Sequence, residues 1–303
     1  MKKILSKTLI SILLLSFSIS FLGCEKPKKT ETATTTKGFI WKVTSNDKHL
    51  YLVGTMHPSP KDCNFFNESI NKIIDESSGI AVECNMKKDN NFQSKALSLI
   101  NLSKGTIEDS LTKDEISKLK QLCKDNDINY DDIKKLSPLG ILQTFQNKLL
   151  NKIDFTGPSF DSLLINEFNG KKKEIVELES VDFQLDLSSK IYNIDTLKKC
   201  LNEDNNKSNN IDKENVIKLF DAFKDGSLSY PEESIREDKK NPEYYKLLVY
   251  DRNINMTSKI ENLLNSGKVY MVAVGYKHYV GEDSIIEHLK EKGYKIERLL
   301  PFE

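Results

Sequence analysis

The sequence lacks a net charge. Its 303 residues carry 45 Lys and Arg against 45 Asp and Glu, so the chain has no excess of positive charge to attract a polyanion over long range. Nucleic acid is therefore not an expected partner. At 38% hydrophobic residues the chain can still bury a sizeable core, and its 30% charged residues predict a well-solvated, largely helical exterior.

Cysteine is scarce and does not occur at the spacings of a zinc module. No two cysteines form a CxxC pair and none stands at finger spacing from a histidine, so a structural zinc site is not expected. Apart from Cys24, the cysteines are Cys63, Cys84, Cys123 and Cys200. This even number permits disulfides in an exported chain, and spacing alone leaves three pairings open.

Large apolar side chains are missing from EKPKKTETATTTK, residues 25–37. Such a segment cannot bury enough surface to offset the entropy lost on ordering. The composition predicts a disordered tether between residue 24 and a folded domain at residues 38–303.

Residues 1–24 have the pattern of an export signal. Lysines precede an apolar and hydroxyl-bearing stretch, residues 8–22, which is too short to span a membrane as a stable helix. The end of this segment, Phe21-Leu22-Gly23-Cys24, resembles a bacterial lipobox, in which the cysteine is lipidated; an ordinary cleaved signal is the alternative. Several acyl chains on Cys24, palmitate among them, would anchor the mature protein durably. The expected location is the extracytoplasmic face of the cell membrane.

The first part of the folded region predicts strands around a helix. FIWKVTSNDKHLYLVGTMH, residues 39–57, reads as two strands joined by the turn residues 45–47. FFNESINKIIDESSG, residues 65–79, has apolar residues at helical spacing, and the apolar run GIAVECN follows it. Strand, helix and strand in this order predict a βαβ unit with parallel pairing.

The middle of the chain is predicted to be mainly helical. Residues 86–150 and 200–265 contain successive amphipathic segments, interrupted by the asparagine-rich stretch 202–213, which predicts a surface loop. The expected fold is α/β, with a central mixed, largely parallel sheet and a helical cap inserted in the middle.

A Gly-x-x-His motif occurs twice, each time after an apolar strand. Gly54-Thr55-Met56-His57 precedes a helix and a short strand that ends at Glu83. Gly275-Tyr276-Lys277-His278 precedes a helix and a strand that carries Glu297. The repeated order predicts two related strand, motif, helix and strand units. A further apolar strand, IVELE, ends at Glu179.

The two histidines are expected to meet at one edge of the sheet. Ligands of open parallel sheets bind at the carboxyl ends of the strands, and both motifs stand there. The motif glycines are Gly54, Gly275 and Gly281, of which the first two let the backbone turn without a Cβ clash. The arrangement predicts that His57, His278 and at least one glutamate converge.

Two imidazoles and a carboxylate fit two kinds of chemistry. In the metal-dependent alternative, His57, His278 and Glu83 hold a divalent ion such as Mn, Co or Zn, which lowers the pKa of bound water, and Glu179 accepts its proton. In the metal-free alternative, a histidine is the general base and a glutamate orients it. Both alternatives remain open at the level of sequence.

Arg252 and Asn253 lie in the helical segment YDRNINMTSKIENLL. Arg252 is either one half of a surface ion pair or a functional group that clamps a carboxylate or stabilises an oxyanion.

At these residues the chain resembles the TraB/GumN family, which is related to the TIKI proteases. The resemblance rests on WKVTSNDKHLYLVGTMH, AVEC, LSPLG, FDSLLINEFNGKKKEIVELES with Gln184, DRN at 251–253, and the segment from residue 272 to 299 that contains VAVGYKHYVG. It implies an α/β sheet with a helical cap and metal-dependent peptidase chemistry. It also implies catalytic roles for Glu83, Glu179, Arg252 and Asn253 beside the paired histidines His57 and His278.

This chain departs from the family pattern at two places. Tyr276 and Lys277 stand where many relatives have a hydrophobic and a smaller residue, and a bulky or cationic neighbour can crowd or repel a metal. The family's Gly-Val-Asp segment is lengthened here to Gly157-Pro158-Ser159-Phe160-Asp161.

Three functions are consistent with the sequence. The leading expectation is a membrane-anchored extracytoplasmic hydrolase, a metallopeptidase that acts on peptides or another small-molecule substrate. The alternative is a binding lipoprotein that captures a peptide or haem without turnover, with His57, His278 or Tyr276 as the iron ligand. A third is a degenerate family member that serves only in cell-surface interaction.

Overall fold

The computed structural model describes residues 34–202 and 205–299, with side chains left out for residues 205–212. The predicted signal with Cys24, and residues 25–33 of the predicted tether, lie outside the described residues. The chain divides into two compact units. Within the described residues, the helical unit comprises 85–154 and 180–216, and the sheet unit comprises 34–84, 155–179 and 217–299.

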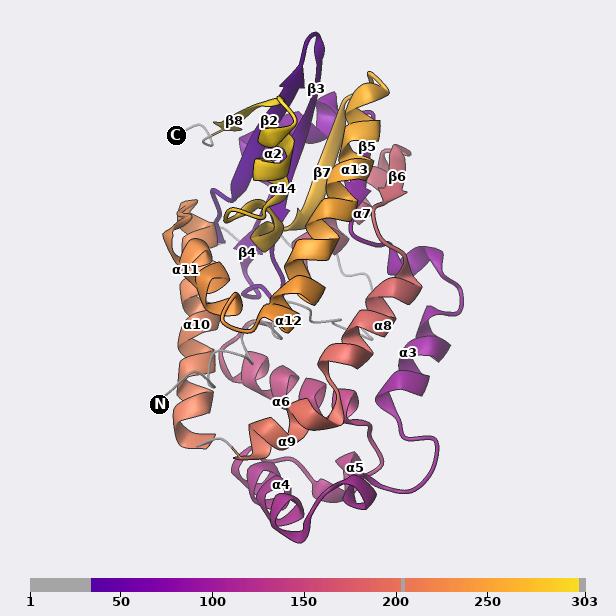
Figure 1. Cartoon of the computed structure of the whole chain (residues 1–303), viewed down its shortest axis with the longest axis vertical. Helices are drawn as coiled ribbons and strands as arrows, with labels where there is room; N and C mark the ends of the chain where they lie inside the picture. Colours follow the sequence, from indigo (N-terminus) through magenta and orange to yellow (C-terminus); the bar gives the residue numbers. More distant parts are fainter. Residues whose placement is uncertain (1–33, 203–204, 300–303) are drawn as a thin grey trace. The chain divides into compact units, whose positions relative to one another are not determined.

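A six-stranded sheet forms the centre of the sheet unit (Figure 1). The strand order is β6-β5-β7-β3-β2-β8. β3 pairs in parallel with β7, β7 with β5, and β5 with β6, whereas β2 is antiparallel to both of its neighbours. The predicted mixed, largely parallel sheet is therefore present. Its strands are β2 (Phe39–Ser45), β3 (Lys48–Thr55), β5 (Gly79–Val82), β6 (Glu174–Glu177), β7 (Tyr270–Gly275) and β8 (Lys295–Leu299).

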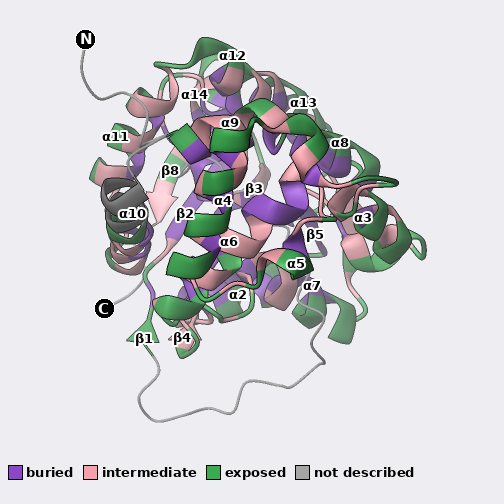
Figure 2. Ribbon diagram, turned by 90° about the horizontal axis from the view of Figure 1, so that it is seen from below, coloured by how far each residue is buried: buried purple, intermediate pink, exposed green. Residues whose placement is uncertain are grey.

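Helices cover both faces of this sheet. In Figure 1, α13 and α14 lie in front of the strands, and α2 and α7 lie behind them. Residues on β3, β5 and β7 are mostly buried, whereas those on the edge strands β6 and β8 are half-buried or exposed. Exposed residues gather on the outer sides of the helices (Figure 2). The sheet unit's helices and turns are α2 (Glu68–Glu76), α7 (Phe160–Gly170), α11 (Ser229–Asp238), α12 (Pro242–Tyr245), the π-helical turn η3 (Lys246–Tyr250), α13 (Asp251–Asn265), the 3₁₀ turn η4 (Tyr276–Tyr279) and α14 (Ile285–Glu291).

The helical unit accounts for the middle of the chain. Polar side chains cap several of its helices at the amino end: Thr112 and Glu115 form the predicted capping box before α4, and Ser137 caps α6. α3 packs on α6 and α8, and α9 packs on α4 and α6. Its elements are η1 (Met86–Lys88), α3 (Phe92–Ile100), η2 (Ile107–Ser110), α4 (Lys113–Asp125), α5 (Tyr130–Ile133), α6 (Pro138–Lys152), α8 (Val181–Ile191), α9 (Ile194–Asn202) and the first part of α10 (Asn205–Asp225).

The expected hairpin at residues 39–57 is present, with the turn at Asn46 in the left-handed region at φ 54°. The expected pairing of β3 with β5 is wrong. β7 lies between them and pairs with both, so the two strands of the first βαβ unit are parallel but not adjacent.

The predicted tether is ordered at its carboxyl end. Residues 34 and 35 form β1 (Thr34–Thr35), which pairs in parallel with β4 (Cys63–Asn64), and Thr36 is buried. Backbone hydrogen bonds to β4 need no apolar side chain, which is why composition placed the boundary too late at residue 37.

The predicted loop at residues 202–213 is also wrong, because α10 begins at Asn205. Asparagine lowers helix stability by only about 0.7 kcal/mol per residue at most. Downstream, Val216, Leu219, Phe220 and Phe223 are buried at helical spacing and anchor the helix to the core.

Two further features are the state of the cysteines and the hydropathy of the helices. The structure describes Cys63, Cys84, Cys123 and Cys200 and shows all four as thiols. No helix in the described part of the chain combines the length and apolarity needed to cross a membrane.

Candidate active site

The carboxyl ends of four parallel strands deliver the candidate site residues. His57 stands two residues beyond β3, and His278 lies in η4 directly after β7. β3 and β7 are neighbours, with Thr55 paired to Gly275 at their ends. Glu83 follows β5 and Glu179 stands two residues beyond β6. The sheet therefore brings both motifs and two glutamates to one edge.

Glu297 does not belong to this group. It lies inside the edge strand β8, opposite Lys42 of β2, and is exposed. The strand after the second motif therefore does not place Glu297 where the strand after the first motif places Glu83. β8 lies on the far side of β2, whereas β5 lies beside β7.

His278 is buried and its ring is oriented by Asn253. The amide Nδ2 of Asn253 donates a hydrogen bond to the main-chain oxygen of Asp283 at 2.7 Å, so its Oδ1 faces Nδ1 of His278 at 2.6 Å. Since that oxygen only accepts, Nδ1 carries the proton and the lone pair lies on Nε2. Burial, assisted by the charge of Arg252, lowers the pKa of His278 to about 3. A neutral ring with a directed lone pair is the form required of a metal ligand or a general base.

Arg252 joins the two glutamates. It lies in α13 with a side chain only 3% exposed, and its guanidinium makes two hydrogen bonds of 2.8 Å to Glu179 and one of 2.7 Å to Glu83. A fourth bond reaches the carbonyl oxygen of Leu248 at 3.1 Å. Arg252 was expected to clamp a carboxylate or to stabilise an oxyanion if it is functional. In the structure it clamps two carboxylates of its own chain. Burial would lower its pKa, but Glu83 and Glu179 outweigh burial and raise it.

Glu83 connects this ion pair network to the second motif. Its Oε1 accepts a hydrogen bond of 2.8 Å from the backbone N–H of Gly275 and lies 3.8 Å from Nε2 of His278. Burial alone would raise the pKa of Glu83, but the charge of Arg252, with the Gly275 N–H among the groups that assist it, outweighs burial and lowers the pKa to about 2. Glu83 is therefore ionised, and the field of its charge reaches His57 as well.

His57 has a different environment from His278. Its side chain is 23% exposed, and its Nε2 lies 3.6 Å from Oδ2 of Asp161. Asp161 is the second residue of α7, and its Oδ1 accepts a hydrogen bond of 2.7 Å from Thr55. No described residue donates a hydrogen bond to Asp161 Oδ2, which is buried. Burial is also the main cause that raises the pKa of Asp161.

Asp161 and Thr55 lie in the site although the sequence pattern predicts no role for either residue. Asp161 lies in the lengthened Gly157–Asp161 segment, and Thr55 lies inside the first motif. A bridge between Ser59 and Gly157 and a hydrogen bond from Phe160 N to Met56 O bring α7 against the first motif. Only the approach of α7, roughly a hundred residues later in the chain, could reveal Asp161 as part of the site.

The first two motif glycines are required by close packing rather than by a turn. A Cβ on Gly54 would lie 2.7 Å from Cβ of Tyr276, and one on Gly275 would lie 3.2 Å from Glu83 Oε1. Gly54 therefore leaves room for Tyr276 of the second motif to pack on β3. Gly275 leaves room for Glu83 to reach its backbone N–H. Gly281, in contrast, has φ +90°, which favours glycine by conformation.

The two unusual motif residues point away from the site. Tyr276 is 1% exposed, and its ring packs near Phe39 and Phe223 with centroids 5.2 and 6.0 Å away. Its hydroxyl is buried within this unit. Lys277 forms a 2.7 Å ion pair with Asp238, so its charge is compensated.

Metal-ligating side chains are present, but they do not form a closed cluster. No three His, Cys, Asp or Glu side chains within residues 34–202 and 205–299 converge at the spacing of a formed metal site. The donor types nonetheless fit a divalent ion: His278 presents a lone pair, Glu83 is ionised, and the buried oxygen of Asp161 faces His57. Binding would require these side chains to draw together.

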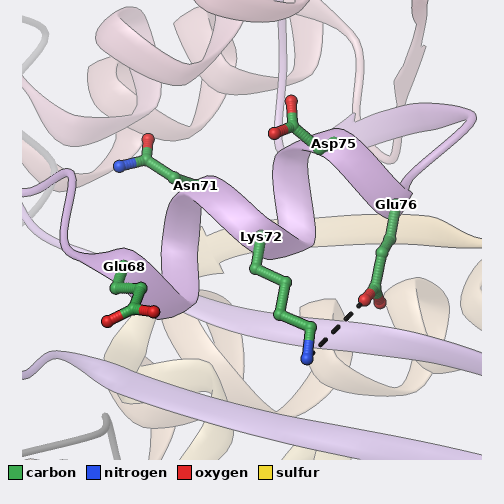
Figure 3. Close-up of a pocket in the computed structure, with 5 residues that line it drawn as sticks. All are labelled: Glu68, Asn71, Lys72, Asp75 and Glu76. Carbon is green, nitrogen blue, oxygen red and sulfur yellow. Dashed lines mark ion pairs between the residues drawn. The ribbon is translucent and has the colours of Figure 1, made fainter.

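A separate hollow lies along the outer side of α2. Figure 3 shows its lining, in which Lys72 and Glu76 form an ion pair of 4.0 Å. None of its residues belongs to the strand-end group. The lining residues are Glu68, Asn71, Lys72, Asp75 and Glu76.

A family model described as the TraB/PrgY/gumN family matches residues 39–298. The chain belongs to the TraB/PrgY/gumN family. A "Metalloprotease TIKI homolog" from Amphimedon queenslandica is 41% identical over 54 residues, which are 17% of this chain and 11% of that relative. No solved structure matches the chain.

In this TraB/PrgY/gumN protein, the role of Asn253 can be tested through the tautomer of His278. Asn253→Ala should replace the single Nδ1–H tautomer by a mixture, because the oxygen that holds the proton is removed. Long-range ¹⁵N–¹H NMR of imidazoles measures the tautomer, and the chain has only four histidines to assign. Asn255→Ala, at an exposed position of α13, is the control. An unchanged His278 signal in Asn253→Ala would contradict the assignment.

Arg252→Met should destabilise the domain strongly. It leaves the buried Glu179 and the half-buried Glu83 without their cation, a change that costs about 3–5 kcal/mol of the free energy of unfolding. Arg252→Lys should recover only part of this loss, because an ammonium cannot reproduce the bidentate geometry. Denaturant unfolding gives the measurement, and Arg236→Met, on the exposed side of α11, is the control. Equal losses in both Met variants would rule out a central role for Arg252.

The burial of His278 predicts a pH dependence of stability. Its folded-state pKa of about 3 lies below the usual histidine value of 6.5, so between these values the unfolded chain binds one more proton than the folded chain. The free energy of unfolding of chelator-treated protein should therefore fall as pH falls, with His278 contributing up to about 1.4 kcal/mol per pH unit. The slope between pH 4.5 and 6.5 should decrease in His278→Gln. Identical slopes would refute this prediction.

Proposed function

We propose that this protein is an extracytoplasmic, lipid-anchored hydrolase that cleaves peptide bonds at the carboxyl edge of its sheet. The observation that carries the proposal is the pair of motif histidines at the ends of adjacent parallel strands, beside an ionised Glu83. Family membership and the short similarity to a protein named as a metalloprotease support peptides as the substrate class. The lipobox-like Phe21-Leu22-Gly23-Cys24 supports the anchor.

Each site residue has a distinct role in this proposal. His57 is the more accessible histidine and faces the substrate, whereas His278 is held in one orientation by Asn253. Asp161, rather than Glu179, accepts the proton of the attacking water. Both oxygens of Glu179 are bound to Arg252, whereas Asp161 Oδ2 is buried beside His57 and burial raises the pKa of Asp161 towards that of a useful acid and base.

Metal dependence is part of the proposal. His57, His278 and Glu83 would hold a divalent ion such as Mn, Co or Zn, with Asn253 and Arg252 orienting two of these ligands. When bound, the ion would lower the pKa of water and polarise the scissile carbonyl.

Peptide cleavage and metal content test the proposal together. For protein that starts at Glu25, we expect about one metal ion per chain by elemental analysis, and cleavage of a peptide library that a chelator abolishes. His57→Ala and His278→Ala should each reduce cleavage by about 10²-fold or more. His49→Ala is the matched control, because His49 lies near the start of β3, at the opposite end of the strand from His57.

The outcomes separate the components of the proposal. Cleavage that survives both substitutions would contradict the active site. Cleavage without metal that still depends on both histidines would favour the metal-free acid and base mechanism. Binding of peptide without any cleavage would favour the non-catalytic alternative.

A further inference from the structure

The turn that carries His278 is attached to a segment outside every motif. This segment, residues 229–245, contains α11 and α12. Lys277, the residue before His278, forms its 2.7 Å ion pair with Asp238, the last residue of α11. The two side chains are only 10% and 8% exposed. Breaking a buried ion pair is costly, because either charge would be left alone in the interior.

The same segment also contacts the residue that accepts the hydrogen bond of Asn253. Lys239 pairs with the Asp283 carboxylate at 2.7 Å, and the Tyr245 hydroxyl donates to it at 3.0 Å. The main-chain oxygen of Asp283 in turn accepts from Asn253, which holds His278. The segment therefore reaches His278 by two routes, one through Lys277 and one through Asp283.

The approach of α11 to the loop after His278 is close. A Cβ on Gly281 would lie 3.0 Å from Cγ2 of Ile235 in α11. Within η4, each side chain has its own anchor: Tyr276 packs in the aromatic cluster, Lys277 binds Asp238, and the Tyr279 hydroxyl donates to the Val272 carbonyl at 2.9 Å. The Lys277 anchor joins the turn to α11.

We propose that the buried Lys277–Asp238 pair positions His278, so that α11 acts as an orienting support for the second motif. Lys277 and Asp238 are positioning residues, because they act through His278 and its Asn253 contact. The catalytic consequence rests on the proposed function, whereas the orientation of the ring does not. A pair that served stability alone would leave the tautomer and orientation of His278 unchanged when it is broken.

The experiment records the imidazole ¹⁵N–¹H spectra and peptide cleavage of the full domain, starting at Glu25, in matched variants. Lys277→Met and Asp238→Asn should each shift the His278 nitrogen signals and populate the second tautomer, while the signals of His49 remain in place. The kcat should fall about tenfold or more with KM within about twofold, as expected when a reacting group is displaced. Lys277→Arg, which keeps the cation, should retain the parental spectrum and most of the kcat.

Lys246→Met is the matched control. It breaks the exposed Lys246–Asp251 ion pair next to Arg252 and should change neither the His278 signals nor cleavage. Asp238→Asn alters charge with little change of shape, so it decides the question if Lys277→Met does not fold.

Parental His278 signals in folded Lys277→Met or Asp238→Asn would overturn the proposal and leave the pair as a stabilising contact only. If no protein in the series cleaves peptides, the proposed function fails, and the spectra still decide whether the pair positions His278.

Discussion

The site depends on the ion pairs that the buried guanidinium of Arg252 forms with Glu83 and Glu179. Two carboxylates, Glu83 and Glu179, emerge from neighbouring strand ends into a buried region where like charges repel. Arg252 enters from α13 and neutralises part of this charge, with three short hydrogen bonds to the two groups. Glu83 can then remain ionised and accept the backbone N–H of Gly275. One cation thereby connects three parallel strands and one helix.

The two motifs have the same pattern but different environments. His278 is almost fully buried, neutral and fixed by Asn253. His57 is partly exposed and faces the carboxylate of Asp161, whose Oδ2 accepts no hydrogen bond from any residue that the structure describes. A rigid histidine beside a more accessible one suits a site in which one group is preorganised and the other meets substrate. The asymmetry arises because α13 packs over the second motif and α7 over the first.

The departures from the family pattern at Tyr276 and Lys277 do not disturb the site. Tyr276 contributes its ring to the aromatic core, where Gly54 leaves room for its Cβ. Lys277 is turned towards Asp238, and its charge is compensated within the fold. The residues at positions 276 and 277 are therefore compatible with the geometry of His278, because each of their side chains has a partner elsewhere in the fold.

The local sequence pattern determined most of the strands and the positions of four site residues along the chain. Apolar runs followed by Gly-x-x-His or glutamate indicated the strands and placed His57, Glu83, Glu179 and His278 at their carboxyl ends, because strand length and termination depend on neighbouring residues. Tertiary structure alone decided the order of the strands, which inserted β7 between β3 and β5 and moved Glu297 away from the site. It also decided that Asp161 meets His57, that Arg252 binds two glutamates, and that residues 34–37 are ordered. These features arise from contacts between residues far apart in the sequence, up to the pair Ile40 and Leu299, which no local periodicity encodes.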